Sequence, residues 1–173
     1  GSPPEPRDML GSVELPPGWL TLNEAKELQT LAANQQVLEL GSYKGRSTVV
    51  MASTAKLVVS VDWHKGDIHV ASENTLEEFT QNIKDYPNIV PFVGRFADVV
   101  PQLTEYQFDG VLVDGQHDFK SVQDDMKLAL SLKPKWIAVH DWGGFAVKPA
   151  ITEMGLTPTR IVETLAVLDL TES

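Results

Sequence analysis

The chain has 173 residues, of which 42% are hydrophobic and 22% are charged, and these proportions are typical of one folded globular domain. Its 24 acidic and 14 basic residues give a formal net charge of −10, which argues against sequence-independent binding to nucleic acid or to an anionic membrane surface. Because the chain has no cysteine, disulfide bonds, thiolate zinc sites and a cysteine nucleophile are excluded. It shows neither an apolar run of the roughly 20 residues that cross a bilayer nor a signal-peptide pattern, so we expect a cytoplasmic protein.

Residues 1–17 carry five prolines and are expected to form an extended arm outside the domain, which we place at residues 18–173. Gly1-Ser2 has the form of a cloning remnant. The sequence leaves open whether the arm is disordered or lies across a binding site as a partial lid.

Apolar patterns along the rest of the chain predict alternating helices and strands. Thr21-Leu22-Asn23-Glu24 has the form of a capping box, and apolar residues at helical spacing follow it as far as Ala32. Strands of the buried type are predicted at residues 37–41, 57–62, 89–93, 108–114 and 136–141. Further helices are predicted at about residues 45–54, 71–85, 97–103, 119–132 and 147–154.

The order of these elements predicts the fold class. Strands that alternate with helices indicate an α/β fold with a doubly wound, mainly parallel Rossmann-like sheet and helices on both faces. Pro91 has no amide hydrogen to donate, so the strand at residues 89–93 is expected at an edge of the sheet. Residues 159–163 and 165–170 predict a C-terminal antiparallel hairpin.

A glycine turn, Gly41-Ser42-Tyr43-Lys44-Gly45, separates the strand at residues 37–41 from the helix that follows it. Glycine lacks the Cβ that would block close approach, and the start of a helix offers free amide donors, so such turns bind small anionic or zwitterionic ligands. Asp62 ends the next strand 21 residues after Gly41, near the interval at which dinucleotide-binding folds place an acid on the ribose hydroxyls. We therefore predict a nucleotide-like cofactor at this turn.

Further polar residues gather at the carboxyl ends of the predicted strands, where open α/β sheets bind their ligands. They are Asp114, Gly115, Gln116, His117, His140 and Asp141. Either histidine can take a proton from a substrate hydroxyl near neutral pH, and the carboxylates of Asp114 and Asp141 can hold a magnesium-like ion. Two acids are too few ligands to decide for a metal, and the simpler alternative is that Asp114 caps the next helix and His140 makes a structural hydrogen bond.

The joint spacing of these motifs resembles that of class I S-adenosylmethionine-dependent methyltransferases, and most closely the branch similar to macrocin-type sugar O-methyltransferases. In that branch a strand commonly ends Glu-x-Gly-x-x-x-Gly-x-Ser, and this chain has Glu39-Leu40-Gly41-Ser42-Tyr43-Lys44-Gly45-Arg46-Ser47. The resemblance covers roughly residues 18–170 and includes Val61-Asp62, residues 94–101, residues 109–119 and residues 137–142.

The resemblance implies a role for each matched residue. Those implied around the methionine part of S-adenosyl-L-methionine are Glu39, Gly41, Ser42, Tyr43 and Gly45, and Ser47 is a further expected cofactor-binding residue. Asp62 would hold the ribose, while Trp63, Arg95 and Phe96 would border the adenine. Asp114 would lie near the sulfonium and, with Asp141, would supply oxygens to a divalent metal such as Mg²⁺ where relatives use one. His117 stands where similar sequences often carry a histidine.

Two departures from the family pattern are informative. Arg95 stands where many relatives have an acid that reads the adenine amine, and Trp142 stands where metal-using relatives often have another acid or an asparagine. The chain also has no large insertion that would wall off a substrate pocket. The site is therefore expected to be open, or completed by the N-terminal arm or by a second subunit of a homo-oligomer.

The resulting hypothesis is O-methyl transfer to a small hydroxylated acceptor such as a sugar, with His117 or His140 as the base. One alternative is a cofactor-binding sensor or assembly subunit without catalysis. Another is an NAD-dependent oxidoreductase, which the glycine spacing argues against because the turn lacks the Gly-x-Gly-x-x-Gly pattern.

Overall fold

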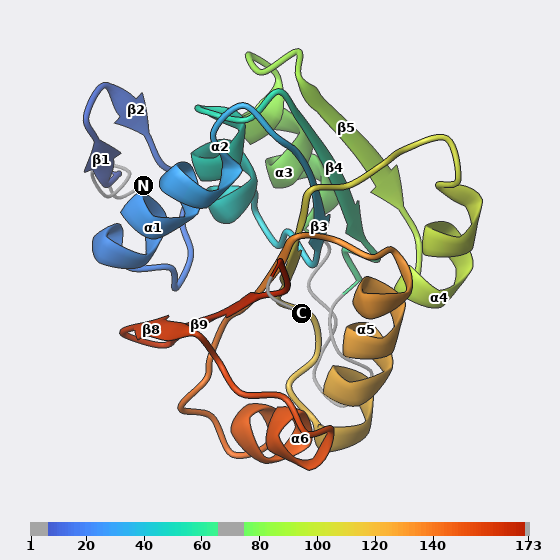
Figure 1. The fold of residues 1–173 in the computed structure, drawn as a ribbon. Coiled ribbons are helices and arrows are strands. Elements are labelled where there is room, and N and C mark those ends of the chain that lie inside the picture. Colours follow the sequence, from blue (N-terminus) through green and yellow to red (C-terminus); the bar gives the residue numbers. More distant parts are fainter. Residues whose placement is uncertain (1–6, 66–74, 172–173) are drawn as a thin grey trace.

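A computed structural model of the chain describes residues 7–65 and 75–171 (Figure 1). Its main sheet has seven strands within these residues, in the order β5-β4-β3-β6-β7-β9-β8. Their bounds are β3 Gln36–Leu40, β4 Leu57–Asp62, β5 Ile89–Val93, β6 Gly110–Val113, β7 Trp136–Val139, β8 Arg160–Val162 and β9 Leu165–Asp169. The first five pair in parallel, and β9 lies antiparallel between β7 and β8, which confirms the predicted C-terminal hairpin.

Helices cover both faces of this sheet, as the alternation of elements predicts. They are α1 Leu22–Ala32, α2 Arg46–Ala52, α3 Leu76–Ile83, α4 Phe96–Val99, α5 Phe119–Ser131 and α6 Val147–Glu153. Residues of α1, α2 and α3 pack with Val37 and Val58 on one face, while α5 and α6 pack with Leu38 and Val59 on the other. The side chains of neighbouring residues in a strand point to opposite faces, so each strand contributes to both cores.

Several predicted boundaries change by a few residues. The strand predicted at 108–114 spans only Gly110–Val113, and the one predicted at 136–141 ends at Val139, so Asp114, His140 and Asp141 lie just beyond the strand ends. The helix predicted at 97–103 is the short α4 followed by a 3₁₀ turn at Val100–Gln102. The predicted start of the third helix at residue 71 lies outside the described residues. Pro91 lies in β5 at the edge of the sheet, as expected.

The described part of the predicted N-terminal arm, from residue 7 to residue 17, turns back on itself. Met9–Leu10 (β1) and Val13–Glu14 (β2) form a small antiparallel hairpin. Leu10 and Leu15 are buried against residues of α1 and α2, because burial removes their apolar side chains from water. The prediction rested on the proline content and did not take these two leucines into account. Residues 1–6, including the Gly1-Ser2 pair, lie outside the described residues. The domain boundary at residue 17 stays a prediction.

Arg46, the first residue of α2, attaches this N-terminal segment to the rest of the molecule. Its side chain is 7% exposed, and it donates to the carbonyl oxygens of Leu20 (2.7 Å) and Pro16 (3.1 Å) and to the carboxylate of Asp8 (2.7 Å). Hydrogen bonds from a charged donor to partly buried acceptors are among the stronger ones in proteins. The N-terminal segment is therefore held against the start of α2.

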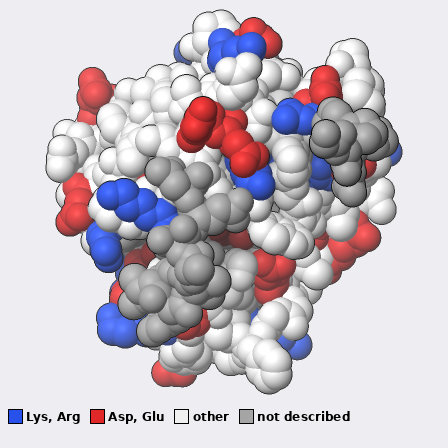
Figure 2. All heavy atoms as spheres, turned by 180° about the vertical axis from the view of Figure 1, so that it is seen from behind, with Lys and Arg blue, Asp and Glu red and all other residues white. Residues whose placement is uncertain are grey.

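Figure 2 shows one face of the molecule, on which acidic and basic side chains of the described residues are mixed. Neither sign forms one continuous surface on this face. Within the described residues, no helix is both long enough and apolar enough to cross a membrane.

Replacing Arg46 by alanine is expected to lower the free energy of unfolding by about 3 kcal/mol, because two buried carbonyl oxygens and one carboxylate lose their donor. Urea unfolding followed by circular dichroism measures this change. Arg160→Ala is the control, since it removes a more exposed ion pair with Glu27 and is expected to cost less than about 1 kcal/mol. Equal effects of the two substitutions would contradict the proposed anchoring role of Arg46.

Candidate active site

The turn between β3 and α2 has two positions, 41 and 45, whose backbone conformation favours glycine. Gly41 and Gly45 have φ values of +99° and +100°, in the left-handed region that favours glycine. A Cβ at Gly41 would lie 2.2 Å from the main-chain oxygen of Asp114, far inside van der Waals contact. Glycine at this position therefore allows the ends of β3 and β6 to approach each other.

Glu39 lies beneath this turn, fully buried. Its carboxylate accepts hydrogen bonds from the hydroxyls of Ser47, Thr48 and Ser60. Burial raises the pKa of Glu39 to about 7, although the three hydroxyls act in the opposite direction. Through these hydroxyls Glu39 fixes the start of α2. It lines neither of the cavities described below, whereas Ser47 reaches the second cavity, and a contact of Glu39 with the cofactor stays a prediction.

Asp62 holds the turn from the neighbouring strand. One of its oxygens, Oδ2, accepts hydrogen bonds from the backbone amides of Ser42 (2.7 Å) and Tyr43 (2.9 Å). The other, Oδ1, accepts from the amide of His64 (2.7 Å). The side chain also lines the first cavity, where a carboxylate with remaining lone pairs can accept from the hydroxyls of a ribose.

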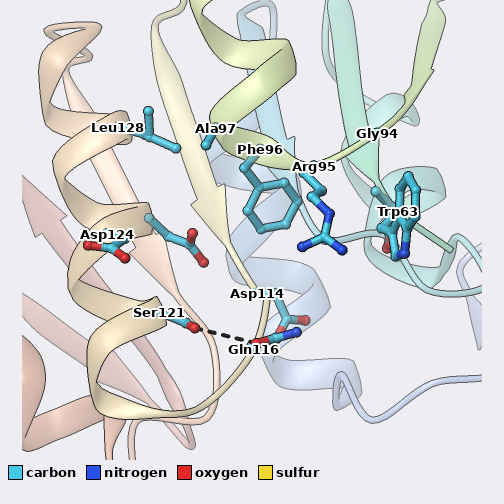
Figure 3. A pocket seen from close by; sticks show the side chains of 14 residues that line it. Trp63, Gly94, Arg95, Phe96, Ala97, Asp114, Gln116, Ser121, Asp124 and Leu128 are labelled. Carbon is cyan, nitrogen blue, oxygen red and sulfur yellow. Dashed lines mark hydrogen bonds between the residues drawn. The ribbon is translucent and has the colours of Figure 1, made fainter. Parts of the chain in front are cut away.

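The first cavity has a volume of about 400 Å³, within the range of small-molecule sites. It brings together six of the residues predicted to bind the cofactor, namely Gly41, Asp62, Trp63, Arg95, Phe96 and Asp114. Figure 3 shows Phe96, Arg95 and Trp63 along one wall and the side chains of α5 along the opposite wall. The guanidinium of Arg95 lies 5.2 Å from the centre of the Trp63 ring, a distance at which a cation interacts with an aromatic face.

The wall formed by α5 was not predicted from the sequence. It contributes Ser121, Asp124, Asp125 and Leu128, joined by Gly115 and Gln116 from the loop before the helix. Ser121 donates a 3.4 Å hydrogen bond to Gln116, which connects helix and loop (Figure 3). Acids on a helix usually face solvent, so no local pattern pointed to these residues.

A second cavity of about 180 Å³ adjoins the first. Gly41, Asp114 and Gly115 line both cavities, so the two meet where β3 and β6 end. The predicted residues Ser42, Tyr43, Ser47, His117, His140 and Asp141 line the second cavity. Trp19 forms its rim, 74% exposed, with its ring 4.9 Å from that of Tyr43. Gly45 lines neither cavity; it is the N-cap residue of α2.

Two histidines and two carboxylates form a cluster in the second cavity. The His117 Nε2 atom lies 3.1 Å from Asp141 Oδ2 and 3.4 Å from Asp114 Oδ1. The His140 Nδ1 atom lies 3.5 Å from Asp114 Oδ2 and 3.8 Å from Asp141 Oδ1. The His117 side chain is 48% exposed, whereas that of His140 is 4% exposed, so only His117 is open to an incoming molecule.

The charges of this cluster shift its pKa values. The hydrogen bond with Asp114 raises the pKa of His117, against the opposing effect of burial. Burial also opposes a charge on His140, but Asp114, Asp141 and Glu24 outweigh it and raise the pKa of His140 to about 9. Conversely, the two histidines lower the pKa of Asp114 although burial acts to raise it. His140 is therefore an imidazolium at neutral pH.

Glu24 fixes the orientation of His140, a role that the sequence did not reveal. It forms the predicted capping box with Thr21, which confirms the start of α1. Its Oε1 atom also accepts a 3.0 Å hydrogen bond from His140 Nε2, while Oε2 accepts from the amide and the hydroxyl of Thr164. Glu24 is fully buried, and burial acts to raise its pKa, but these donors outweigh burial and lower it. The capping box was the only local signal for Glu24.

Asp114, His140 and Asp141 also form a set that can hold a metal ion, with one ligand atom of each within 4.8 Å of the others. The hydrogen bond of His140 Nε2 to Glu24 leaves Nδ1 facing the carboxylates, as in sites where a carboxylate orients a metal-binding imidazole. The donor set therefore fits a divalent cation. Binding would require His140 to lose its proton, which its raised pKa opposes.

Comparison with protein families shows to which family the chain belongs. Residues 38–142 match the family model described as "Methyltransferase domain". The chain belongs to this family. It is a class I S-adenosylmethionine-dependent methyltransferase, in agreement with the strand order and with the cavities at Gly41. A search of curated proteins finds no significant match.

Solved structures with the same fold include O-methyltransferases. The structure of cofactor-bound Rv0187 from MTB superposes with a TM-score of 0.72 at 22% identity, over 92% of this chain and 85% of that chain. The O-methyltransferase TomG from Streptomyces achromogenes, in complex with SAM, superposes with a TM-score of 0.68 at 18% identity, over 87% of this chain and 81% of that chain. An O-methyltransferase from Bacillus cereus, in complex with SAH, superposes with a TM-score of 0.65 at 18% identity, over 90% of this chain and 84% of that chain. At these identities the likeness is one of fold.

The raised pKa of Glu39 predicts a pH dependence of stability. A carboxyl whose pKa rises on folding stabilises the folded state at low pH, and this contribution is lost as the pH rises from about 4.5 through about 7. Glu39→Gln is neutral throughout this range. Between pH 5 and pH 7.5 its free energy of unfolding is therefore expected to fall by about 2 kcal/mol less than that of the unmodified chain.

Urea unfolding at the two pH values tests this expectation. Asp125, whose pKa is also raised, is unchanged in both proteins and contributes equally to both curves. Parallel curves for the two proteins would show that Glu39 is ionised throughout this range.

Proposed function

We propose that this methyltransferase transfers the methyl group of S-adenosyl-L-methionine to a hydroxyl group of a small acceptor, such as a sugar. The observation that carries the proposal is the position of His117. Its half-exposed imidazole lies in the second cavity, beside the junction with the first at Asp114. A base at such a junction can face an acceptor hydroxyl while the methyl donor extends from the first cavity to the glycine turn.

The two cavities suggest how the cofactor would be divided between them. The first has aromatic and charged groups suited to a nucleoside, with Asp62 for the ribose and Trp63, Arg95 and Phe96 around the adenine. The backbone of the turn at residues 41–45 and the carboxylate of Asp114 would bind the methionine part and its ammonium group. Bound there, the sulfonium supplies an electrophilic methyl group, so the protein contributes mainly alignment.

Proton transfer to His117 would complete the reaction. Neutral His117 keeps its proton on Nε2, which faces the carboxylates of Asp114 and Asp141, and accepts the proton of the acceptor hydroxyl through Nδ1. The same two carboxylates stabilise the imidazolium that forms. Because these carboxylates raise the pKa of His117, a neutral base becomes available only as the pH rises above the usual range for histidine. His140 is less suited to this role, since it is buried and bonded to Glu24.

A divalent cation such as Mg²⁺ is a second way to activate the hydroxyl. Asp114, Asp141 and the Nδ1 atom of His140 would hold it, and it would lower the pKa of a hydroxyl bound to it. His117 would then lie beside the ion as a positioning group or base. The metal hypothesis and the base hypothesis share their carboxylates, and the two are separated by the tests below.

The acceptor would lie between Trp19, Tyr43 and His117. The two aromatic rings form an exposed wall, and the flat face of a sugar or of an aromatic ring packs well on such a surface. The second cavity is small, and a second copy of the chain would supply a further wall. These features agree with the macrocin-type resemblance in the sequence, on which the sugar acceptor rests.

If His117 is the base, His117→Gln is expected to lower kcat by at least about 100-fold, because glutamine cannot accept the proton. The affinity for S-adenosylhomocysteine is expected to change by less than about threefold, since the cofactor contacts remain. Release of S-adenosylhomocysteine from the methyl donor, measured over a panel of hydroxylated acceptors, gives kcat. The activity of the unmodified protein should rise with pH through the raised pKa of His117, and any residual activity of the variant should not.

The same measurements separate the alternatives. Unchanged turnover of His117→Gln would refute the role of His117 as base. Binding of S-adenosylhomocysteine without turnover of any acceptor would favour a cofactor-binding subunit without catalysis. Stabilisation by NAD and not by S-adenosylhomocysteine would refute the proposed methyl donor.

For the metal hypothesis, calorimetric titration with MgCl₂ is expected to show that Asp141→Asn binds at least about tenfold more weakly than the unmodified protein. Asparagine is a suitable replacement because Asp141 has a φ of +61°, which asparagine also adopts readily. Asp124→Asn, an acid outside the cluster that pairs with Lys120, is the control and should bind like the unmodified protein. Identical weak heats from all three proteins would exclude a magnesium site at Asp141.

A further inference from the structure

Asp125 is an acid inside the cofactor cavity that the functions described so far do not use. It lies on α5, is 7% exposed, and lines the first cavity. Among the described residues, no side chain or backbone group forms a hydrogen bond or ion pair with its carboxyl group, whose oxygens are open to the cavity. A buried carboxyl without a protein partner carries an unfavourable desolvation energy, which a ligand with the matching groups would offset.

The surroundings of Asp125 show which part of a ligand it would meet. A Cβ at Gly115 would lie 2.8 Å from Asp125 Oδ2 and 2.6 Å from the Phe96 ring, so both side chains converge on this glycine. Gly115 has no side chain to occupy this space. Asp125 and Phe96 line only the first cavity, whereas the cluster around His117 lies in the second. The carboxyl group therefore faces the aromatic end of the nucleoside cavity.

We propose that Asp125 recognises the adenine base of S-adenosyl-L-methionine through the 6-amino group and the neighbouring N1 atom. This inference rests on the proposed binding of the cofactor in the first cavity. The amino group of adenine is a hydrogen-bond donor and N1 is an acceptor. A protonated carboxyl group offers the complementary pair, since its carbonyl oxygen accepts from the amine and its O–H donates to N1.

The position of Asp125 also accounts for an unusual feature of the sequence. Arg95 occupies the place where the resemblance leads one to expect an acid that reads the adenine amine. The Arg95 guanidinium instead lies over the Trp63 ring. Asp125 supplies an acid to the same cavity from α5, on the opposite wall.

The protonation state of Asp125 fits this role. Burial raises the pKa of Asp125 to about 7, and the nearby charges of Asp124 and Asp118 act in the same direction. The other charged side chains that line this cavity are Asp62, Arg95 and Asp114. A neutral carboxyl is therefore abundant below pH 7, and contact with N1 favours the protonated form further, as linkage requires.

Isothermal titration calorimetry with S-adenosylhomocysteine and its 1-deaza analogue, in which C–H replaces N1, tests this pairing. At pH 6 the unmodified protein is expected to bind S-adenosylhomocysteine at least about tenfold more tightly than the analogue. At pH 8.5 the preference should shrink, because the ionised carboxylate has no proton to donate. Glu39 also titrates near pH 7 and is present in every protein tested. The quantity compared at each pH is therefore the ratio of the two affinities, for the unmodified protein and for each variant.

Three variants complete the experiment. Asp125→Ala should bind S-adenosylhomocysteine about tenfold more weakly at pH 6 and should bind the two ligands equally. Asp125→Asn carries an amide that donates and accepts at every pH, so it should keep both the affinity and the preference at pH 8.5. Lys127→Gln changes an exposed residue of α5 that lines neither cavity, and should behave like the unmodified protein. Thermal unfolding of each variant shows that it is folded.

The outcomes separate this inference from the proposed function. Wild-type affinity and an unchanged preference in Asp125→Ala would overturn the role of Asp125 while leaving cofactor binding intact. Equal affinity of the unmodified protein for the two ligands at pH 6 would also overturn it. An absence of any binding of S-adenosylhomocysteine by the unmodified protein would instead overturn the proposed function.

Discussion

At the end of β3, the main chain of Gly41 passes so close to the main-chain oxygen of Asp114 that no side chain fits between them. Most features of the site follow from this contact. It brings the end of β6 beside the glycine turn, and Gly41 and Asp114 consequently line both cavities. Asp62 then fixes the turn from β4 by accepting the amides of Ser42 and Tyr43. A larger residue at position 41 would separate the strand ends, and both the cofactor cavity and the histidine cluster would lose their common wall.

The buried acids of the molecule differ in charge because they differ in their donors. Glu39 receives only neutral hydroxyls, which do not compensate for burial, so its pKa rises. Glu24 receives backbone amides, a hydroxyl and the imidazolium of His140, and its pKa falls. Asp114 is likewise kept ionised by two histidines. Negative charge is thereby retained beside the two histidines at the junction of the cavities, where a sulfonium or a divalent cation would be stabilised. Glu39, in contrast, is half protonated near pH 7 and largely neutral well below it.

The sequence predicted the parts of this arrangement that depend on local patterns. Apolar runs identified the strands, the capping box identified the start of α1, and the acids at strand ends identified the edge of the sheet at which the cavities open. Contacts between distant segments could not be predicted. Glu24 and His140 are 116 residues apart in the chain, and their hydrogen bond depends on how α1 packs beside β7. Asp124 and Asp125 look alike in the sequence, and only the rotation of α5 against the sheet buries Asp125. At the N-terminus, proline content concealed the two leucines that fold the segment back onto the domain.

That N-terminal segment connects the acceptor side of the site to the cofactor turn. Arg46 begins α2 directly after the turn, and its side chain holds the carbonyl oxygens of Pro16 and Leu20 on either side of Trp19. A Cβ at Gly18 would lie 2.9 Å from the Arg46 Cδ atom, so the backbone before Trp19 packs closely on the same side chain. Trp19 in turn contacts Tyr43 within the turn itself. The aromatic wall of the second cavity and the glycine turn at the junction of the two cavities are therefore parts of one packed unit. A change in the backbone of the turn would move both the wall for the acceptor and the binding site for the cofactor.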